Sequence, residues 1–362
     1  MFGKTGSILW SLVLLVLLSF GAACAPAAAP TPTPVPPKPA PKAEATKPPA
    51  PAATQPAKPA AATPAAAAKK PEVAQLRAGV MPIENNSIVY AADKLGYFKD
   101  EGLTVETSVI GGGAEIIPGV IAGRLNFGYS NVVSVLQARA QGFDVVIVSG
   151  VVAAPSSPPD ADRMMVKADS TLKTANDLVG KRLGTNNLNN IVWLLERAWL
   201  KKGGADPDKV TFREIPFPQM ADAIVNGQID VGWTIEPFGS VAVEAGKLKV
   251  FAHPLYEYQP GMDVAVFVAS EKWVKENPNT AAGYANALGR AIDLMTKNVA
   301  DRKKYGIEFT KTEPALMDKI VLAPLRTKVD QTTLQKTADL MVEHGLLKEK
   351  LDVSKMIWAS AK

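Results

Sequence analysis

A run of amide side chains is the densest cluster of polar, uncharged chemistry in the sequence. The stretch GTNNLNN (184–190) stands where a helix is expected to begin, and it carries Thr185, Asn186, Asn187, Asn189 and Asn190. One asparagine is enough to cap a helix N-terminus. The other amides can donate and accept hydrogen bonds, so we expect Thr185, Asn187 and Asn189 to contact a small ligand.

Two phrases in the sequence repeat one pattern, VIAGRLNFGYS (120–130) and IVNGQIDVGWT (224–234). In each phrase we expect a helix to end at a glycine, Gly123 or Gly227, because a left-handed C-cap favours glycine. A short strand follows each glycine. The chain therefore contains two copies of one helix-to-strand turn.

The strands that follow these glycines end in Tyr129-Ser130 and in Trp233-Thr234. Ligands of open α/β sheets bind at the carboxyl ends of strands. Two facing lobes would therefore each offer an aromatic ring and a hydroxyl group to one cleft. The alternative is that both aromatic rings pack beneath a loop.

Three further stretches follow expected strands and complete the candidate site. PIENNS (82–87) precedes a helix, so its asparagines are either helix caps or ligand donors. GGGAE (111–115) leads into a helix N-terminus whose amides suit an anion or a carbonyl group, and WTIEPFG (233–239) adds an acidic side chain. The residues that we expect to contact a ligand are Asn85, Asn86, Tyr129, Ser130, Asn131, Thr185, Asn187, Asn189, Trp233 and Glu236.

Short strands and helices alternate between these stretches, which predicts an α/β fold with mainly parallel sheets. The alternation starts at residue 75, restarts at residue 181 and becomes helical after residue 270. Strands are expected at 75–81, 102–110, 125–129, 143–150, 181–185, 209–215, 229–233, 247–251 and 263–270. Helices are expected at 87–98, 114–123, 132–142, 190–202, 219–227 and 237–246.

The N-terminus predicts an export signal followed by a lipid attachment site. Lys4 precedes an apolar stretch at 8–20, which is shorter than the roughly 20 residues of a membrane span, and small residues follow it. Cys24, the single cysteine of the chain, comes directly after them. We therefore expect a signal peptide at 1–23 and a lipid on Cys24. The alternative is ordinary cleavage that leaves a free thiol.

A tether rich in alanine and proline follows at 24–71. It contains no aromatic residue and cannot bury enough apolar surface to fold, so we expect it to be disordered. Its six lysines and single glutamate account for the net charge of +5 of the whole chain. The rest of the chain is nearly neutral, and we expect it to bind no nucleic acid.

The expected elements and their connecting phrases resemble the periplasmic binding proteins of ABC importers, in the branch for nitrate, sulfonates, taurine, thiamine-precursor pyrimidines and riboflavin. The resemblance covers nearly all of 76 to about 294. The stretches that carry it are AADKLGYFKDEGLTVE, GGGAEIIPGVIAGRLNFGYSN, MMVKADSTLKTANDLVGKRLGT, AIVNGQIDVGWTIEPF and VFVASEKWVKENPNTAAGYANAL.

This resemblance implies a two-lobed fold of the type II periplasmic binding proteins, with two hinge crossovers. Lobe one would comprise 72–168 and 265–362, and lobe two 169–264, with hinges near 167–169 and 261–264. It also implies a monomer that captures a small molecule between its lobes and delivers it to the permease and ATPase of an importer. The lipid anchor would hold it at the extracytoplasmic face of the cell membrane.

The charges in the candidate stretches favour one class of ligand. The stretches contain no arginine or lysine, whereas Glu84, Glu115 and Glu236 are present, and a carboxylate beside a bound anion is unfavourable. Amides, aromatic rings and a carboxylate suit a flat heterocycle. We therefore expect riboflavin or a thiamine-precursor pyrimidine, and a sulfonate, taurine or nitrate anion is the alternative.

Catalysis is the main alternative of another class, because the resemblance includes a pyrimidine synthase on the same fold that uses histidine and cysteine. Beyond Cys24 the chain has no cysteine, and its two histidines, His253 and His344, lie outside the candidate stretches. Metalloprotease, nucleophile-elbow and phosphate-loop motifs are also absent from the sequence. We therefore expect a binding protein with no catalytic residue, cofactor or metal.

Overall fold

A computed structural model describes residues 70–362 of the chain. The predicted signal peptide, the lipid site at Cys24 and nearly all of the predicted tether lie outside the described residues. Among residues 70–362, no helix combines the length and the apolar composition that a membrane crossing requires.

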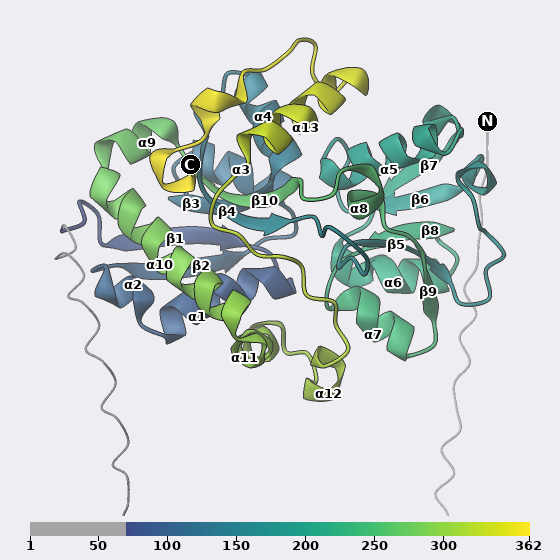
Figure 1. The fold of residues 1–362 in the computed structure, drawn as a ribbon, viewed down its shortest axis with the longest axis horizontal. Helices are drawn as coiled ribbons and strands as arrows, with labels where there is room; N and C mark the ends of the chain where they lie inside the picture. The colour runs from purple at the N-terminus through teal and green to yellow at the C-terminus, as the bar shows by residue number, and fades with distance from the viewer. Residues whose placement is uncertain (1–69) are drawn as a thin grey trace, which may run out of the picture. The chain divides into compact units, whose positions relative to one another are not determined.

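The first of two sheets, sheet one, has five strands in the order β2-β1-β3-β10-β4 (Figure 1). Four strands run in one direction, and β10 runs antiparallel to both of its neighbours. Strands β4 and β10 are buried along their whole length, which explains their continuous apolar sequences. The strands are β1 (Gln75–Val80), β2 (Thr104–Val109), β3 (Phe127–Asn131), β4 (Val146–Ala153) and β10 (Asp263–Ala269).

Sheet two repeats this arrangement in the order β7-β6-β8-β5-β9, with β5 as the antiparallel strand. The two sheets therefore have the same topology, as the repeated sequence pattern predicts. The strands are β5 (Arg163–Lys167), β6 (Arg182–Thr185), β7 (Thr211–Glu214), β8 (Val231–Thr234) and β9 (Leu248–Ala252). We call the elements around sheet one lobe one and those around sheet two lobe two.

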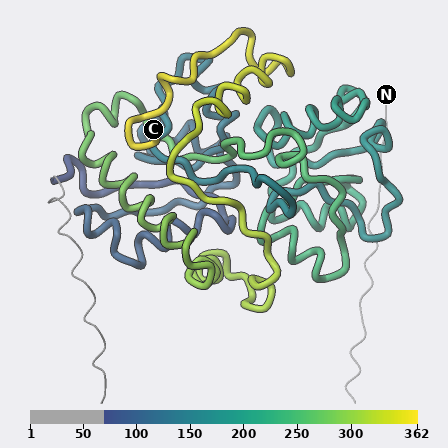
Figure 2. The backbone as a smooth tube through the Cα atoms, viewed as in Figure 1, coloured from purple at the N-terminus to yellow at the C-terminus, as the bar shows by residue number. Residues whose placement is uncertain are grey.

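The chain crosses between the two sheets at 154–162 and at 253–262, and its backbone can be followed in Figure 2. The predicted division is wrong for one strand. It places β5 in lobe one, with a hinge near 167–169, whereas β5 pairs with β8 and β9 in sheet two. The alternation of strands and helices does not reveal this, because β5 enters the middle of the sheet directly from the crossing segment. The other lobe boundaries remain a proposal.

Helices cover both faces of each sheet (Figure 1). In lobe one, α1, α2 and α10 pack together on one face, and α3 and α4 lie on the other. The helices of lobe one are α1 (Ser87–Lys94), α2 (Tyr97–Asp100), α3 (Gly113–Ile121), α4 (Val132–Ala140), α9 (Glu271–Glu276), α10 (Pro278–Lys297), α11 (Val299–Thr310), α12 (Pro314–Met317) and α13 (Gln331–Glu343). The predicted helix at 87–98 is interrupted, because Gly96 adopts a left-handed conformation with φ of 75° between α1 and α2.

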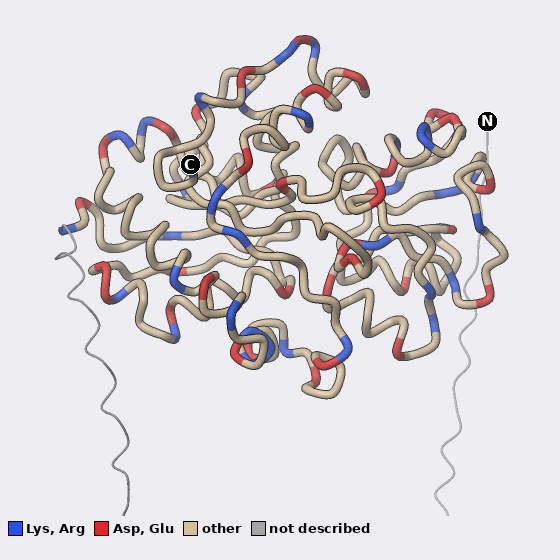
Figure 3. Tube along the Cα trace, viewed as in Figure 1, with Lys and Arg blue, Asp and Glu red and all other residues tan. Residues whose placement is uncertain are grey.

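Lobe two is smaller. Helices α5 (Ile191–Lys202) and α8 (Pro254–Tyr258) lie on one face of sheet two, and α6 (Phe217–Val225) and α7 (Phe238–Glu244) lie on the other. Short 3₁₀ helices occur at Glu84–Asn86, Ala175–Leu178, Pro207–Lys209, Val353–Met356 and Ala359–Ala361. Lysine and arginine are interspersed with aspartate and glutamate along both lobes (Figure 3).

Glycines hold the central helix of each lobe close to its sheet. Gly128 lies beside Gly79 in sheet one, and a Cβ atom at Gly128 would lie 2.4 Å from Cγ2 of Ile116 on α3. Gly184 pairs with Gly232 in sheet two and leaves the corresponding space under α6. The predicted C-caps are also confirmed, since both repeat glycines have φ of 68°. These contacts place the start of α3 beside the carboxyl end of β3.

Candidate ligand-binding cleft

A cavity of about 40 Å³ lies between the lobes at the carboxyl ends of their strands. This volume holds a few water molecules, so a ligand of several ring atoms requires the lobes to separate. The apolar wall includes Met81 and Val264 of lobe one, and Phe217 and Ile235 of lobe two. The polar side chains that line the cavity are Tyr129, Asn131, Asp162, Asn186 and Asn190.

Asn131 connects the two lobes. Its Oδ1 accepts hydrogen bonds from the backbone N–H of Ser134 at 2.9 Å and from that of Ile191 at 3.3 Å. The first donor belongs to the first turn of α4 and the second to the first residue of α5. One side chain from lobe one therefore caps helices in both lobes, and it lines the cavity; its predicted contact with a ligand stays a prediction.

The asparagine run forms a chain of amide hydrogen bonds. Asn190 caps α5 through the N–H of Trp193 at 3.1 Å, and its Nδ2 donates to Oδ1 of Asn186 at 2.7 Å. Asn186 in turn donates to Oδ1 of Asn187 at 3.2 Å. The members of the run that line the cavity are Asn186 and Asn190.

The three members of the run that we expect to contact a ligand, Thr185, Asn187 and Asn189, do not line the cavity. The hydroxyl of Thr185 is buried and donates to the carbonyl of Asn187 at 3.2 Å. The Asn187 amide reaches Glu115 of lobe one at 3.5 Å. Asn189 is exposed, has φ of 58° and borders a separate hollow of about 290 Å³ between α3 and α4. A run of polar residues at a helix start does not by itself show which side chains turn inward.

Asn85 and Asn86 shape the turn after β1 and do not line the cavity. Oδ1 of Asn86 accepts from the N–H of Met81 at 3.1 Å, and its Nδ2 donates to Asn85 at 3.0 Å. Ser130 is fully buried beneath the start of α3, where its hydroxyl donates to the carbonyl of Asn131 at 3.4 Å. Tyr129 does line the cavity, and burial raises the pKa of its phenol, which therefore stays neutral.

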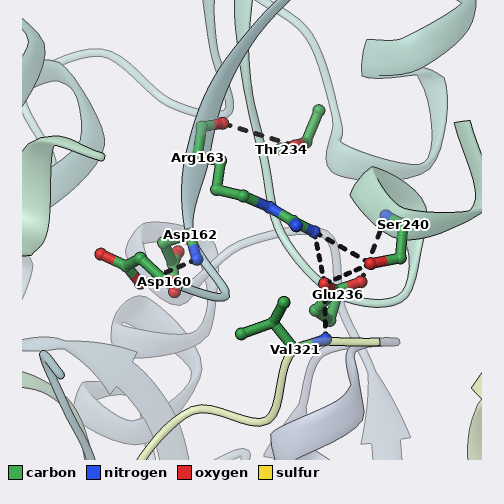
Figure 4. Close-up of polar contacts among 7 residues, drawn as sticks. All are labelled: Asp160, Asp162, Arg163, Thr234, Glu236, Ser240 and Val321. Atoms are coloured by element: carbon green, nitrogen blue, oxygen red, sulfur yellow. Dashed lines mark hydrogen bonds and ion pairs between the residues drawn. The ribbon is translucent and has the colours of Figure 1, made fainter. Parts of the chain in front are cut away.

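Trp233 is packed beneath the cavity, as in the alternative that the sequence leaves open. Its ring is 1% exposed, and its Nε1–H donates to Oδ1 of Asp162 at 3.1 Å. Oδ1 of Asp160 accepts from the N–H of Asp162 at 3.0 Å, and its Oδ2 accepts from the N–H of Tyr256 at 3.3 Å. The neighbouring Asp160 and Asp162 are labelled in Figure 4.

Both aspartates have raised pKa values. Burial, with the charge of Asp160 as the next cause, raises the pKa of Asp162 to about 8. Burial raises the pKa of Asp160 to about 6, while hydrogen bonds from backbone N–H groups oppose the rise. At neutral pH the pair therefore holds a proton.

Glu236 lies outside the cavity wall, where it is bound by protein groups (Figure 4). It pairs with Arg163 and accepts from the hydroxyl of Ser240 at 2.7 Å and from the N–H of Val321 at 3.0 Å. Burial raises its pKa, and Arg163 opposes that rise. These donors occupy the carboxylate, so it is not free to bind a ligand in this arrangement.

The charge argument from the sequence is therefore wrong for two of its three glutamates. Glu84 is held by Arg302 at 2.8 and 2.7 Å, and Glu236 by Arg163. Neither arginine belongs to the stretches that the sequence singles out. The cavity carboxyl is Asp162, whose only local signal is the acidic phrase PPDADR at 158–163 in the first crossing.

Neither of the two histidines lines the cavity. His253 precedes α8 in the second crossing, where burial lowers its pKa, and His344 caps the end of α13. Within residues 70–362, no group of three or more histidine, cysteine, aspartate or glutamate side chains is placed to hold a metal ion.

Known proteins share the sequence and the fold of this chain. Residues 84–300 match the protein-family model described as NMT1/THI5 like. A formylaminopyrimidine-binding protein of Halalkalibacterium halodurans is 24% identical over 229 residues, 63% of this chain and 67% of that protein. A 4-amino-5-hydroxymethyl-2-methylpyrimidine phosphate synthase of Candida albicans is 24% identical over 239 residues, 63% of this chain and 68% of that protein.

A solved structure extends the likeness to three dimensions. The alkanesulfonate-binding protein SsuA from Xanthomonas axonopodis pv. citri, bound to MOPS, matches with a TM-score of 0.68 at 21% identity. The match covers 79% of this chain and 99% of that one. It confirms the expected α/β fold with two lobes.

Proposed function

The chain belongs to the NMT1/THI5-like family of type II periplasmic binding proteins, and from this premise we propose that it is a solute-binding protein of an ABC importer. The observation that carries the proposal is the cavity whose wall comes from both lobes. A ligand held by both lobes at once favours the closed form over the open one. The permease of the importer would recognise that closed form and receive the ligand from it.

We also propose that the protein acts at the outer side of the cell membrane. A lipid on Cys24 and the tether at 24–71 would hold a monomer at the extracytoplasmic face of the cell membrane. The two segments at 154–162 and 253–262 would act as the hinges, because they are the points where the chain passes from one sheet to the other.

The ligand that we propose is a small nitrogen heterocycle of the pyrimidine type. Neutral polar groups and one carboxyl line the cavity, namely Tyr129, Asn131, Asn186, Asn190 and Asp162. The formylaminopyrimidine-binding relative supports the same class. A sulfonate or nitrate anion is the second candidate, supported by the MOPS-bound protein of the same fold. Neither the cavity nor the relatives supports riboflavin.

Pyrimidine chemistry is the candidate of another class, because one relative is a pyrimidine phosphate synthase. We favour binding alone, since neither His253 nor His344 lines the cavity. The test is to incubate the protein with formylaminopyrimidine and to search for a new product by mass spectrometry. Conversion of the compound would replace the binding proposal by an enzymatic one.

Thermal unfolding of the purified protein tests ligand capture directly. A ligand at a hundredfold excess over its Kd stabilises the folded state by about 2.7 kcal/mol. We expect this stabilisation with formylaminopyrimidine, and ethanesulfonate and nitrate are run in parallel. If none of the three compounds shifts the melting temperature, the proposed ligand classes are wrong.

A further inference from the structure

We infer that Asp162 selects the ligand, because its Oδ2 accepts a hydrogen bond from an N–H group of a heterocycle and its carboxyl disfavours anions. The inference rests on the proposed solute-binding function and narrows the ligand to solutes that donate hydrogen bonds at this point.

The first observation is the position of the Asp162 carboxyl. The residue is 5% exposed and lines the interlobe cavity. Trp233 fixes one oxygen through the bond of 3.1 Å from Nε1 to Oδ1. Among residues 70–362, Oδ2 has no hydrogen-bond partner. The carboxyl is thus oriented by one oxygen, and the other remains for a donor from the ligand.

The second observation is the excess of acidic groups around this carboxyl. The charged or titratable groups that act on it are Asp160, Arg163, Glu236 and Tyr129. Among residues 70–362, the cation of this group, Arg163, already pairs with Glu236. Asp160, Asp162 and Glu236 therefore share one guanidinium. A ligand that donates N–H or carries positive charge lowers the cost of ionising Asp162, whereas an anion increases it.

The third observation concerns the starts of α4 and α5, two of the helix starts at the cavity; the start of α3 at Gly113 also lines the cavity, and within the described part of the chain no side chain caps it. The N–H groups of Ser134 and Ile191 both donate to Asn131, and the N–H of Trp193 donates to Asn190. Asparagine side chains therefore occupy these donors at the starts of α4 and α5. An anion in the cavity would compete with these caps, while a hydrogen-bond donor would not.

Asp162 also lies in the first crossing between the lobes. Through Asp160 it is linked to the N–H of Tyr256, within the second crossing. The group that binds the ligand is therefore connected to both segments that connect the lobes. The residues that would contact the ligand are therefore hydrogen-bonded to the segments that would move when the lobes close.

The variant Asp162→Asn tests this inference by changing an acceptor into a donor. The Trp233 N–H keeps the side-chain oxygen in place, so the amide nitrogen of the variant stands where Oδ2 was. We expect the affinity for formylaminopyrimidine to fall at least about tenfold and the affinity for ethanesulfonate to rise at least about tenfold. Both are measured by isothermal titration calorimetry of the full-length protein at pH 8.5.

A matched control is Asp230→Asn. Asp230 is a partly buried carboxyl of lobe two, paired with Arg182 at 2.9 Å and outside the cavity wall. This variant should leave the affinities for both compounds unchanged. A thermal melt without ligand verifies that each variant is folded.

The outcomes separate the inference from the proposed function. If the wild-type protein binds formylaminopyrimidine and Asp162→Asn binds it equally well, the inference is wrong and the proposed function stands. If the wild type binds ethanesulfonate more tightly than formylaminopyrimidine, the inferred preference for hydrogen-bond donors is wrong, while the proposal of a solute-binding protein stands. If the wild type binds neither compound, the proposed ligand and this inference both fail.

The wild-type protein supplies an independent measurement if Asp162→Asn does not fold. An ionised Asp162 accepts from the ligand with no proton to displace, so the affinity for formylaminopyrimidine should rise between pH 7 and pH 9. An affinity that is flat or falls over that range overturns the inference.

Discussion

The backbone N–H of Glu84 in lobe one donates to the backbone carbonyl of Glu236 in lobe two at 3.2 Å. Each of these glutamates is buried and paired with an arginine, Arg302 for the first and Arg163 for the second. Two buried ion pairs therefore stand on either side of one contact between the lobes. The backbone N–H of Val321, from the chain after α12, also donates to the Glu236 carboxylate at 3.0 Å.

Arg302→Met should destabilise the protein strongly, because it leaves Glu84 charged and buried without its partner. The expected loss in the free energy of unfolding is about 3–5 kcal/mol, measured by urea denaturation. The control is Arg290→Met, which removes the exposed pair with Asp100 and the contact with the Tyr97 ring and should cost at most about 2 kcal/mol. Equal losses in the two variants would show that the buried pair contributes no more to the free energy of unfolding than the exposed pair does.

Gly112→Ala should hinder closure of the lobes. A Cβ atom there would lie 2.2 Å from Oδ1 of Asn187 in the other lobe, and the backbone is extended with φ of −157°. The contacted oxygen ends a half-buried side chain that can rotate away, so the cost should be about 1 kcal/mol, the low end for overpacking, and ligand affinity should fall about 5-fold. Calorimetry measures the affinity, and small-angle scattering at subsaturating ligand should show a larger radius of gyration than for the wild type.

Gly111→Ala is the neighbouring control for that experiment. A Cβ atom at Gly111 would meet only Glu115, at 3.4 Å or more. Scattering and affinity should therefore match the wild type. If both alanine variants behave alike, the contact between Gly112 and Asn187 does not limit closure.

Trp233→Phe should shift the pH dependence of ligand binding upward. The wild-type affinity for formylaminopyrimidine should fall as the pH drops below about 8, because Asp162 then takes up a proton. The hydrogen bond from Trp233 lowers the pKa of Asp162, so its loss raises that pKa and moves the midpoint higher. Calorimetry from pH 6 to pH 9 measures both midpoints. A midpoint that is unchanged or lower in the variant would contradict this assignment.

Glu196→Leu should stabilise the protein at alkaline pH. Glu196 is fully buried in α5, both of its oxygens lack a partner among residues 70–362, and burial raises its pKa well above the ordinary value. The folded state therefore holds a proton that the unfolded state has lost above about pH 4.5, so this group favours folding more as the pH falls. At pH 8 the variant should gain about 1–3 kcal/mol in the free energy of unfolding.

Urea denaturation at pH 5 and pH 8 checks this prediction. The wild type should lose stability between the two values, and the variant should lose less. The raised pKa values of Asp160 and Asp162 act in the same direction and remain in both proteins. If the variant has the same pH dependence of stability as the wild type, the ionisation of Glu196 does not contribute to that dependence and the prediction is wrong.

Local rules account for most of the fold that the sequence predicts. Glycines end helices at Gly123 and Gly227, and Asn190 begins α5. The sheet to which β5 belongs cannot be predicted from local rules. The strand directly continues a crossing segment, and its neighbours in the sheet, β8 and β9, come much later in the chain.

The candidate site is harder to predict, because its groups are paired over long distances in the sequence. The Trp233 ring is bound by a residue 71 positions earlier, and the Glu236 carboxylate by one 73 positions earlier. The sequence close to Trp233 or to Glu236 contains no pattern that predicts which residue is its partner. Tyr129 and Asn131 line the cavity as the sequence suggests, because their strand end and helix cap are local features, and their contact with a ligand stays a prediction.

The position of β10 between β3 and β4 has a consequence for biosynthesis. Sheet two consists of one uninterrupted run of strands, β5 to β9, and can assemble as soon as that run leaves the ribosome. Sheet one must wait for β10, so the facing edges of β3 and β4 stay unpaired while the whole of lobe two is being made. Such edges pair readily with other chains, so the nascent protein is most exposed to aggregation during that interval.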